Sequence, residues 1–171
     1  MRRMTTGAGA LLLLAVLPAA SLHAQDESGI RVGSAAPVVT VNDLDGKPVN
    51  FGQWLGKKPV LVEFWATWCP NCEELLPRLR EARKQLGDKV EFLAVNVTVN
   101  QTPERVRRYL QDHEVPFRIL YDDKGTSVRA YQAPATSYVV IADARGRVVY
   151  TGLGGDQQFE NALRRAAGVT E

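Results

Sequence analysis

The sequence contains few of the side chains that bind soft metals, and this scarcity limits its chemistry. Among its 171 residues there are two cysteines, Cys69 and Cys72, and two methionines, both within the first four positions. The two histidines are His23 and His113. A structural zinc site needs four ligands, and a copper-binding protein favours Met, Cys and His side chains. A metal-binding chaperone is therefore kept only as a minor alternative, and no metal site is predicted.

A long hydrophobic run is also missing. The apolar segment Gly7–Leu17 is shorter than the roughly 20 residues that a membrane-spanning helix needs, and Pro18 interrupts it. Arg2 and Arg3 precede this segment, and small residues follow it, an order typical of a secretory signal peptide. We predict a signal peptide over residues 1–24 and one domain over residues 25–171. A retained N-terminal anchor is the alternative.

A strong charge of either sign is absent as well. The formal net charge is +2, and cleavage after residue 24 would remove two arginines and no acid, leaving a mature chain with no net charge. Nucleic acid is therefore a poor candidate partner. We expect the mature protein to be periplasmic or otherwise exported, without stable membrane insertion. Disulfides form and persist in such a compartment.

Apolar runs of strand length alternate with segments of helical period, which predicts an α/β domain. Residues 60–65 read as a buried central strand, and residues 70–86 as a helix that ends at Gly87. Thr102 is the expected N-cap of a helix that ends near His113, and Asp156 the expected N-cap of a last helix over residues 156–167. The other predicted elements are strands 90–97, 119–121 and 138–142, a short helix over 126–131, a return strand at 148–150, and a hairpin over 38–51.

The two cysteines form a CXXC motif, Cys69-Pro70-Asn71-Cys72, at the predicted junction of strand and helix. The helix N-terminus supplies unpaired N–H groups and a positive dipole end, which would stabilise a thiolate on Cys69. Cys72 lies one turn further along, where it would attack a mixed disulfide formed by Cys69. We therefore expect Cys69 to be the exposed nucleophile and Cys72 the shielded resolving thiol.

Two structural interpretations of the motif compete with this one. A structural disulfide across so short a loop constrains the unfolded chain little, because the entropic benefit grows with loop length. Half of a zinc site would need further ligands, and His113 lies on a distant predicted helix. Redox chemistry is the favoured interpretation. The redox-active Cys69–Cys72 disulfide would then serve without any other cofactor.

Residues 62–72 read VEFWATWCPNC, and this segment resembles the active site of the TlpA/ResA-like branch of the thioredoxin superfamily. The similarity extends over about residues 33–167, through Glu74, Pro77 and the turn 143–146. The resemblance implies a thioredoxin fold: a mixed central sheet with helices on both faces, here with an N-terminal β-hairpin and an inserted helix over about residues 102–113. It also implies an exported protein-disulfide reductase, in some relatives for cytochrome c maturation, that a membrane thiol-disulfide electron donor recharges. Its other partners would be exported proteins that contain disulfides.

The resemblance places Glu63 at the position of a buried acid in thioredoxins, and it implies that Glu63 acts as a proton acceptor. Burial would raise its pKa and allow proton exchange with Cys72. The alternative is a strand-end acid that reaches solvent or a lysine. The resemblance also implies that Trp68 and Pro70, together with the later loop of Pro134, Thr136 and Ser137, bind substrate.

The sequence departs from the family at the cis-proline that lies opposite the dithiol. Counting back from Gly146 places Ser137 there, three residues after Pro134. We favour serine over a loop bulge that restores Pro134, with a trans peptide before Ser137, because a non-proline cis bond costs about 2.5 to 4 kcal/mol. Ser137 as a plain strand-entry residue stays open. For function, a disulfide oxidase or isomerase is the alternative to the reductase.

Overall fold

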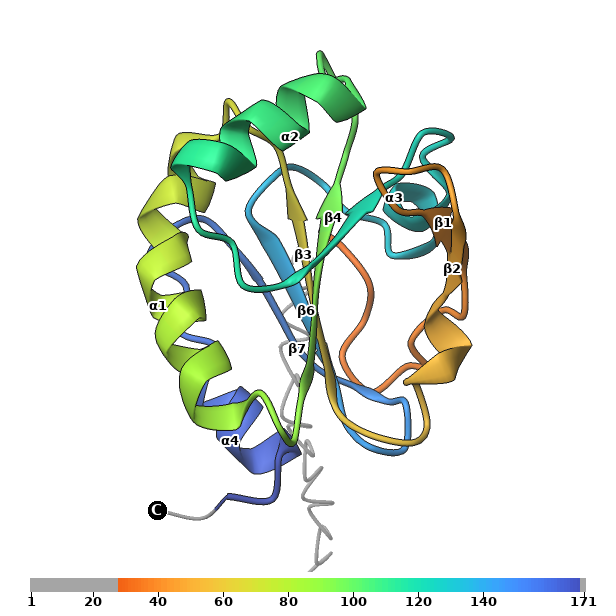
Figure 1. Ribbon diagram of the computed structural model, residues 1–171. Helices are drawn as coiled ribbons and strands as arrows, with labels where there is room; N and C mark the ends of the chain where they lie inside the picture. Colours follow the sequence, from red (N-terminus) through yellow and green to blue (C-terminus); the bar gives the residue numbers. More distant parts are fainter. Residues whose placement is uncertain (1–27, 170–171) are drawn as a thin grey trace, which may run out of the picture.

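The computed structural model describes residues 28–169 of the chain. Within this range the elements follow one another in the alternating order that the sequence predicts (Figure 1). They are β1 (Thr40–Asn42), β2 (Pro48–Asn50), a 3-10 turn η1 (Phe51–Gln53), β3 (Val60–Trp65), α1 (Pro70–Leu86), β4 (Glu91–Asn96), α2 (Pro103–Asp112), β5 (Arg118–Tyr121), α3 (Thr126–Ala130), β6 (Tyr138–Ala142), β7 (Val148–Leu153) and α4 (Glu160–Ala166).

The strands form one mixed sheet in the order β2-β1-β5-β4-β3-β6-β7. β3 pairs in parallel with β4, and β4 in parallel with β5. β6 runs antiparallel to β3, and β7 antiparallel to β6. The β1–β2 hairpin joins the β5 edge through the single antiparallel pair Asn42 and Tyr121. This arrangement confirms the predicted thioredoxin fold with its N-terminal hairpin.

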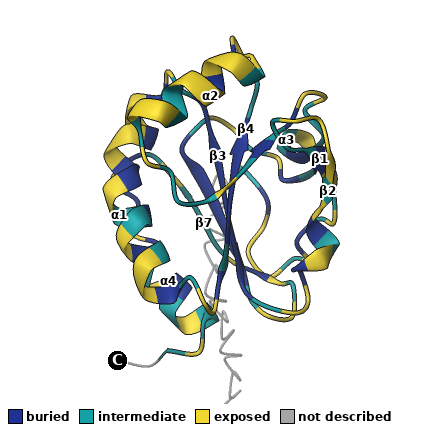
Figure 2. Cartoon of the chain, in the orientation of Figure 1, coloured by how far each residue is buried: buried dark blue, intermediate teal, exposed yellow. Residues whose placement is uncertain are grey.

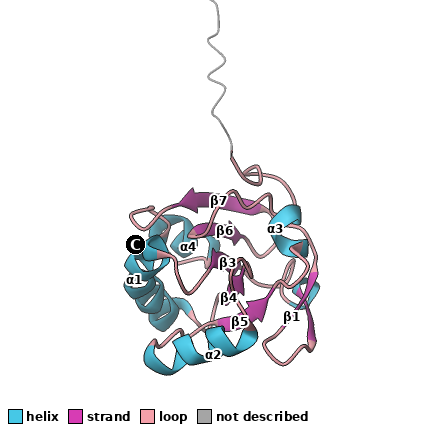
Figure 3. Cartoon of the chain, turned by 90° about the horizontal axis from the view of Figure 1, so that it is seen from above, coloured by secondary structure: helices cyan, strands magenta, loops and turns pink. Residues whose placement is uncertain are grey.

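Helices cover both faces of the sheet (Figure 3). Apolar side chains of α1 and α4, among them Leu79 and Leu163, share one buried cluster with Leu61 of β3. Val128 of α3 packs against the opposite cluster, which contains Phe64. The sheet therefore has a core on each side, and both helix layers are needed to bury it.

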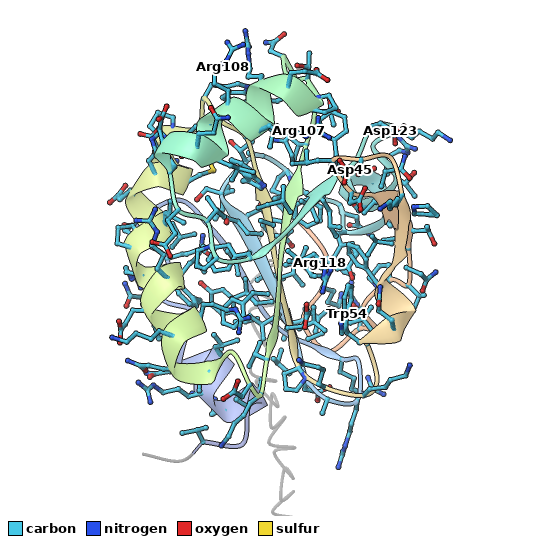
Figure 4. The ribbon with its side chains drawn as sticks, in the orientation of Figure 1. Asp45, Trp54, Arg107, Arg108, Arg118 and Asp123 are labelled. Carbon is cyan, nitrogen blue, oxygen red and sulfur yellow. A yellow bond between two sulfur atoms is a disulfide. The ribbon has the colours of Figure 1, made fainter. Side chains whose placement is uncertain are left out.

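The inserted helix α2 lies over the end of the sheet where β3 gives way to α1 (Figure 1). Its N-cap is Thr102, as predicted, whose hydroxyl accepts a 3.2 Å hydrogen bond from the Arg105 N–H. Val106 is fully buried in a third cluster that also contains Cys69 and Cys72. Arg107 pairs with Asp45 in the turn of the β1–β2 hairpin, at 2.8 Å (Figure 4). The two additions to the fold are thus in contact with each other.

β3 is the buried centre of the molecule, and all six of its residues are shielded from solvent (Figure 2). Val62 and Phe64 enter the cluster on the α3 face, whereas Leu61 and Trp65 lie in clusters on the helix α1 side. Because side chains alternate along a strand, Glu63 falls on the same face as Leu61 and Trp65. The strand thus directs one carboxyl group toward the helix that carries the dithiol.

Several element boundaries differ from the sequence prediction; β7, for example, runs to Leu153 rather than residue 150, and two other differences have clear physical reasons. The last helix begins at Glu160, after Phe159, and Asp156 is exposed and caps nothing. The segment just before this helix is not helical, and in it the Gln157 side chain donates hydrogen bonds to the carbonyl oxygens of Ser137 and Gly154. Near the N-terminus, Asn50 accepts a hydrogen bond from the Gly52 N–H and starts η1, so β2 ends one residue before the expected strand.

The proposed signal peptide over residues 1–24 lies outside the described range. No helix among residues 28–169 has the length and apolar character required to cross a bilayer.

Candidate active site

Cys69 and Cys72 form a disulfide at the N-terminus of α1, with their Cα atoms 5.3 Å apart. Cys69 is the N-cap residue of the helix, with extended backbone angles, and Pro70 occupies the first helical position. The Cys72 N–H donates a 3.1 Å hydrogen bond to the Cys69 sulfur. A helix N-terminus favours negative charge, so this geometry stabilises a thiolate on Cys69 once the disulfide is reduced.

The expectation that Cys69 is the more exposed sulfur-bearing residue is not met in the disulfide form. Cys69 is 2% exposed and Cys72 is 6% exposed. The two sulfurs are bonded to each other, and both residues pack with Trp65 and Ala66 in one buried cluster. The difference between the two cysteines is therefore electrostatic, because the Cys69 sulfur receives the helix N–H.

A second segment fixes the turn that leads into the nucleophile. The Thr67 N–H donates to the side-chain oxygen of Gln101 at 3.1 Å, and the Trp68 indole N–H donates to the Val99 carbonyl oxygen at 2.8 Å. Gln101 is itself buried and receives a 3.3 Å hydrogen bond from the Asn96 side chain. The segment 97–101 after β4 thus holds the segment 66–68 after β3.

Sequence reasoning missed Gln101 and Val99 as parts of this site. Thr98 and Asn100, which flank Val99, both have positive φ, at 65° and 53°. Neither is glycine, and the only sequence signal for this sharp turn is Asn100, a residue type that tolerates positive φ. A signal was nevertheless present in the topology, because the loops that follow two adjacent parallel strands meet at the same edge of a sheet.

Trp68 stands 47% exposed beside the dithiol, and Val99 is 57% exposed. Pro70 is also exposed, and Trp65 is buried, as the sequence suggested. Since the Trp68 N–H is already bonded to Val99, the indole offers its apolar surface to an approaching molecule. The exposed side chains of Trp68 and Val99 thus form an apolar surface next to the nucleophile.

Glu63 is buried, 4% exposed, as predicted from its place in β3. Burial without a compensating charge raises its pKa to about 8. The carboxyl group is therefore largely neutral at pH 7 and is able to exchange a proton near that pH. This environment excludes the alternative of a strand-end acid in solvent, while the proton transfer with Cys72 stays a prediction.

The ring of Tyr109 on α2 lies 5.6 Å from the Trp65 ring, on the face that Glu63 shares. Burial raises the pKa of the Tyr109 hydroxyl, and the nearby carboxylates of Glu73 and Glu63 raise it further. The inserted helix therefore helps to enclose the carboxyl group. His113 stacks on Tyr109 with a centroid distance of 3.9 Å.

Ser137 is the residue predicted at the place of the family proline. It is fully buried at the entry to β6, and its N–H donates a 2.8 Å hydrogen bond to the Phe64 carbonyl oxygen. Pro134, the alternative candidate for this position, lies three residues earlier and is exposed. Thr136, between them, is partly exposed. The peptide bonds of the described residues are all trans, as predicted for Ser137.

The conformation of Ser137 is unusual for a residue other than glycine, with φ at 61°. Three hydrogen bonds hold it there: its N–H is bonded to Phe64, and its carbonyl oxygen accepts from the Gly154 N–H and the Gln157 side chain. Left-handed backbone in a non-glycine residue is costly and often marks a functional site. In the described residues, no group of three or more His, Cys, Asp or Glu side chains is arranged to hold a metal.

Comparisons with known proteins agree with this geometry. The family model described as Redoxin matches residues 31–165. The chain belongs to the Redoxin family. It is 31% identical over 144 residues to the thioredoxin-like protein YneN of Bacillus subtilis, covering 82% of this chain and 84% of that one. It is 31% identical over 142 residues to the thiol-disulfide oxidoreductase ResA of Geobacillus thermodenitrificans, covering 81% and 79%.

Solved structures confirm the fold of this Redoxin-family chain. The thioredoxin domain of a thiol-disulfide oxidoreductase from Bacteroides vulgatus superposes with a TM-score of 0.69 at 23% identity, covering 80% of this chain and 97% of that one. With ResA among its relatives, the resemblance to the TlpA/ResA-like branch is confirmed.

Proposed function

We propose that this Redoxin-family protein, a thiol-disulfide oxidoreductase, works as an exported reductase of protein disulfides. The single observation that carries the proposal is the Cys69–Cys72 pair at the N-terminus of α1, with Cys69 as the N-cap. A thiolate at this place is both stabilised and reactive. The names of the ResA relatives support thiol-disulfide exchange as the reaction.

The reaction proceeds in two exchanges that start from the reduced protein. The Cys69 thiolate attacks one sulfur of a substrate disulfide, and the other substrate sulfur leaves as a thiolate. Cys72 then loses its proton and attacks the Cys69 sulfur, which releases the second substrate thiolate. The protein is left with the Cys69–Cys72 disulfide seen in the structure. Two electrons have moved from the protein to the substrate.

In this scheme Glu63 takes the proton of Cys72 during the second exchange. A base suited to this step has a pKa near the working pH, and burial brings the pKa of Glu63 to about 8. The same carboxyl group would return the proton when the disulfide is reduced again. A membrane thiol-disulfide electron donor is the proposed source of those two electrons.

Export is supported by the order of charged, apolar and small residues over positions 1–24. The proposed location is the periplasm or another exported compartment, and the proposed substrates are exported proteins. Cytochrome c maturation, in which haem-attachment cysteines must be reduced, is the specific pathway we propose. An oxidase or isomerase would use the same dithiol in another direction, which the redox potential decides.

Trapping the first intermediate tests the function. The Cys72→Ser variant, expressed with residues 1–24 present, keeps the attacking thiolate but lacks the group that releases the substrate. We expect it to accumulate mixed disulfides with exported proteins. The matched control is Cys69→Ser, which keeps the same number of thiols but should trap few partners. Equal trapping by both variants, or none by either, would refute exchange through this dithiol and favour metal binding.

The identity of the trapped proteins separates the specific functions. Apoproteins with haem-attachment motifs would support cytochrome c maturation, and a broad set of exported proteins a general reductase or isomerase. The equilibrium of the dithiol with glutathione separates reductase from oxidase. A strongly oxidising value would contradict the reductase proposal.

A further inference from the structure

Two buried side-chain polar atoms in the described residues have no hydrogen-bond partner, and they lie at the ends of two neighbouring strands. They are the indole Nε1 of Trp65 and the hydroxyl Oγ of Ser137. Trp65 is the last residue of β3, and Ser137 immediately precedes β6. An unpaired buried polar group costs about 1 to 3 kcal/mol. Each such group in a native protein requires an explanation, and a redox role is one of the recognised explanations.

Ser137 stands next to the strand end that leads into the dithiol. Phe64 and Tyr138 form the last pair of the antiparallel β3–β6 ladder, and Ser137 directly precedes β6, beside the end of β3 at Trp65. Trp65 belongs to the buried cluster that contains both cysteines. The Ser137 N–H bond to the Phe64 carbonyl oxygen fixes this neighbourhood.

A second chain of contacts leads from Ser137 to the other side of the dithiol. The Ser137 carbonyl oxygen accepts a 3.2 Å hydrogen bond from the Gly154 N–H. The next residue, Gly155, lies against Glu74 of α1, so closely that a Cβ on Gly155 would stand 2.2 Å from a Glu74 carboxylate oxygen. Glu74 is two residues beyond Cys72. Ser137 thus lies between the strand end and the helix start that bracket the cysteines.

We propose that the Ser137 hydroxyl is a redox-dependent hydrogen-bond donor, which binds the Cys69 thiolate when the protein is reduced. This inference deepens the function proposed above and rests on it. In the disulfide form the Ser137 hydroxyl makes no hydrogen bond, to either sulfur or to any other group. Reduction converts the Cys69 sulfur from a weak neutral acceptor into a charged one. Reduction by a dithiol donor adds two electrons and one proton, leaving Cys72 as a thiol and Cys69 as a thiolate. A thiolate is a charged acceptor, and hydrogen bonds to charged groups are the strong ones.

The proposal explains why a serine tolerates this backbone. The positive φ and the unpaired hydroxyl both disfavour the oxidised protein. The second of these costs would disappear on reduction. Ser137 would therefore favour the reduced form and keep the nucleophile ionised. Ser137 would therefore change the pKa of Cys69 and the redox equilibrium of the dithiol in the absence of substrate.

Purified protein tests this without a substrate. In a Cys72→Ala background, the ionisation of Cys69 is followed through the ultraviolet absorbance of its thiolate. In the full dithiol, the equilibrium with glutathione is measured at a pH where Cys69 is ionised. Removal of the hydroxyl by Ser137→Ala should raise the pKa of Cys69 by about one unit and shift the equilibrium about tenfold toward the disulfide.

Two further variants separate the hydroxyl from the backbone. Ser137→Gly also lacks the hydroxyl but fits a positive φ, so it should fold and reproduce both shifts. Ser127→Ala removes another fully buried hydroxyl, one bonded to Asp122 and remote in sequence from the dithiol, and should move neither value. Unchanged values in Ser137→Gly, or opposite shifts in the Ala and Gly variants, would overturn the proposal. Failure of the trapping experiment would instead refute the function itself.

Discussion

The indole N–H of Trp68 donates a 2.8 Å hydrogen bond to the carbonyl oxygen of Val99, thirty-one residues away in the sequence. This bond joins the segment after β3 to the segment after β4 and restrains the aromatic ring beside Cys69. It leaves an exposed apolar surface formed by the two side chains. An exposed aromatic ring whose polar atom is already paired is suited to contact with a polypeptide.

We predict that Trp68 binds the polypeptide around the substrate disulfide. Trp68→Ala should raise KM for a disulfide-containing protein substrate about tenfold, the loss of roughly 1.4 kcal/mol of contact free energy. Trp68→Phe retains an aromatic surface and should raise KM less. Steady-state reduction of insulin checks both variants, with oxidised glutathione as a small substrate that needs no such contact. A KM for insulin that Trp68→Ala leaves unchanged would remove Trp68 from the binding surface.

Gln101 is predicted to position the segment that carries the nucleophile. Gln101→Met has a similar length but leaves the Thr67 N–H and the buried Asn96 amide without their common acceptor. The free energy of unfolding should fall by about 1 to 3 kcal/mol, and the attack rate of Cys69 should also fall. Urea unfolding and single-turnover alkylation measure the two effects. The control is Gln111→Met on the exposed surface of α2, which should change neither.

The sequence was sufficient to predict the central elements of the site, because short-range patterns determine them. The run 60–65 has the length and apolar, β-branched character of a buried strand, and residues 70–86 follow a helical period up to Gly87. The CXXC motif falls at their junction, so the position of the dithiol followed directly. Glu63 was predicted to be buried for the same reason, since it interrupts an otherwise apolar strand.

The contacts that surround the dithiol depend on residues far apart in the chain. Gln101 bonds Thr67 across thirty-four positions, and no local pattern distinguishes this glutamine from an exposed one. Ser137 adopts its positive φ because Phe64, Gly154 and Gln157 hold its backbone. The residue type of Asp156 predicts a helix cap. In the structure, however, the side chain of the neighbouring Gln157 donates a hydrogen bond to the Ser137 carbonyl oxygen, and the helix starts later. Tertiary hydrogen bonds outweighed local preference at each of these places.

The buried carboxyl of Glu63 should make the stability of the folded protein depend on pH. Its pKa rises from 4.5 to about 8 on folding, so the folded state holds this proton more tightly than the unfolded chain. The contribution of Glu63 to stability is therefore lost as the pH rises from about 4.5 through 8. Glu63→Gln removes that loss and should be more stable than the parent at pH 9, by up to ~5 kcal/mol. Urea unfolding of the two oxidised proteins at pH 5 and pH 9 measures the difference, and an equal difference at both values would contradict the raised pKa.

The same substitution should slow the second exchange of the catalytic cycle. Only the ionised carboxyl accepts a proton from Cys72, so in the parent protein the release rate should increase as the pH rises through about 8. Glu63→Gln should release substrate more slowly and lack this part of the pH dependence. Stopped-flow decay of a preformed mixed disulfide on Cys69 measures the step. Identical pH profiles would assign Glu63 a purely structural role.

Restoring the proline of the family at position 137 should damage this protein. Proline fixes φ near −65°, whereas Ser137 has φ at 61°, and proline lacks the N–H that Ser137 donates to the Phe64 carbonyl oxygen. Ser137→Pro should therefore lower the free energy of unfolding by about 3 kcal/mol. Ser137→Gly, which keeps the N–H and accommodates a positive φ, should be at least as stable as the parent. Thermal and urea unfolding of the oxidised proteins compare the three. A Ser137→Pro variant of undiminished stability would mean that the loop readily adopts the family conformation, and that the hydrogen bond from Ser137 to β3 contributes little to its shape.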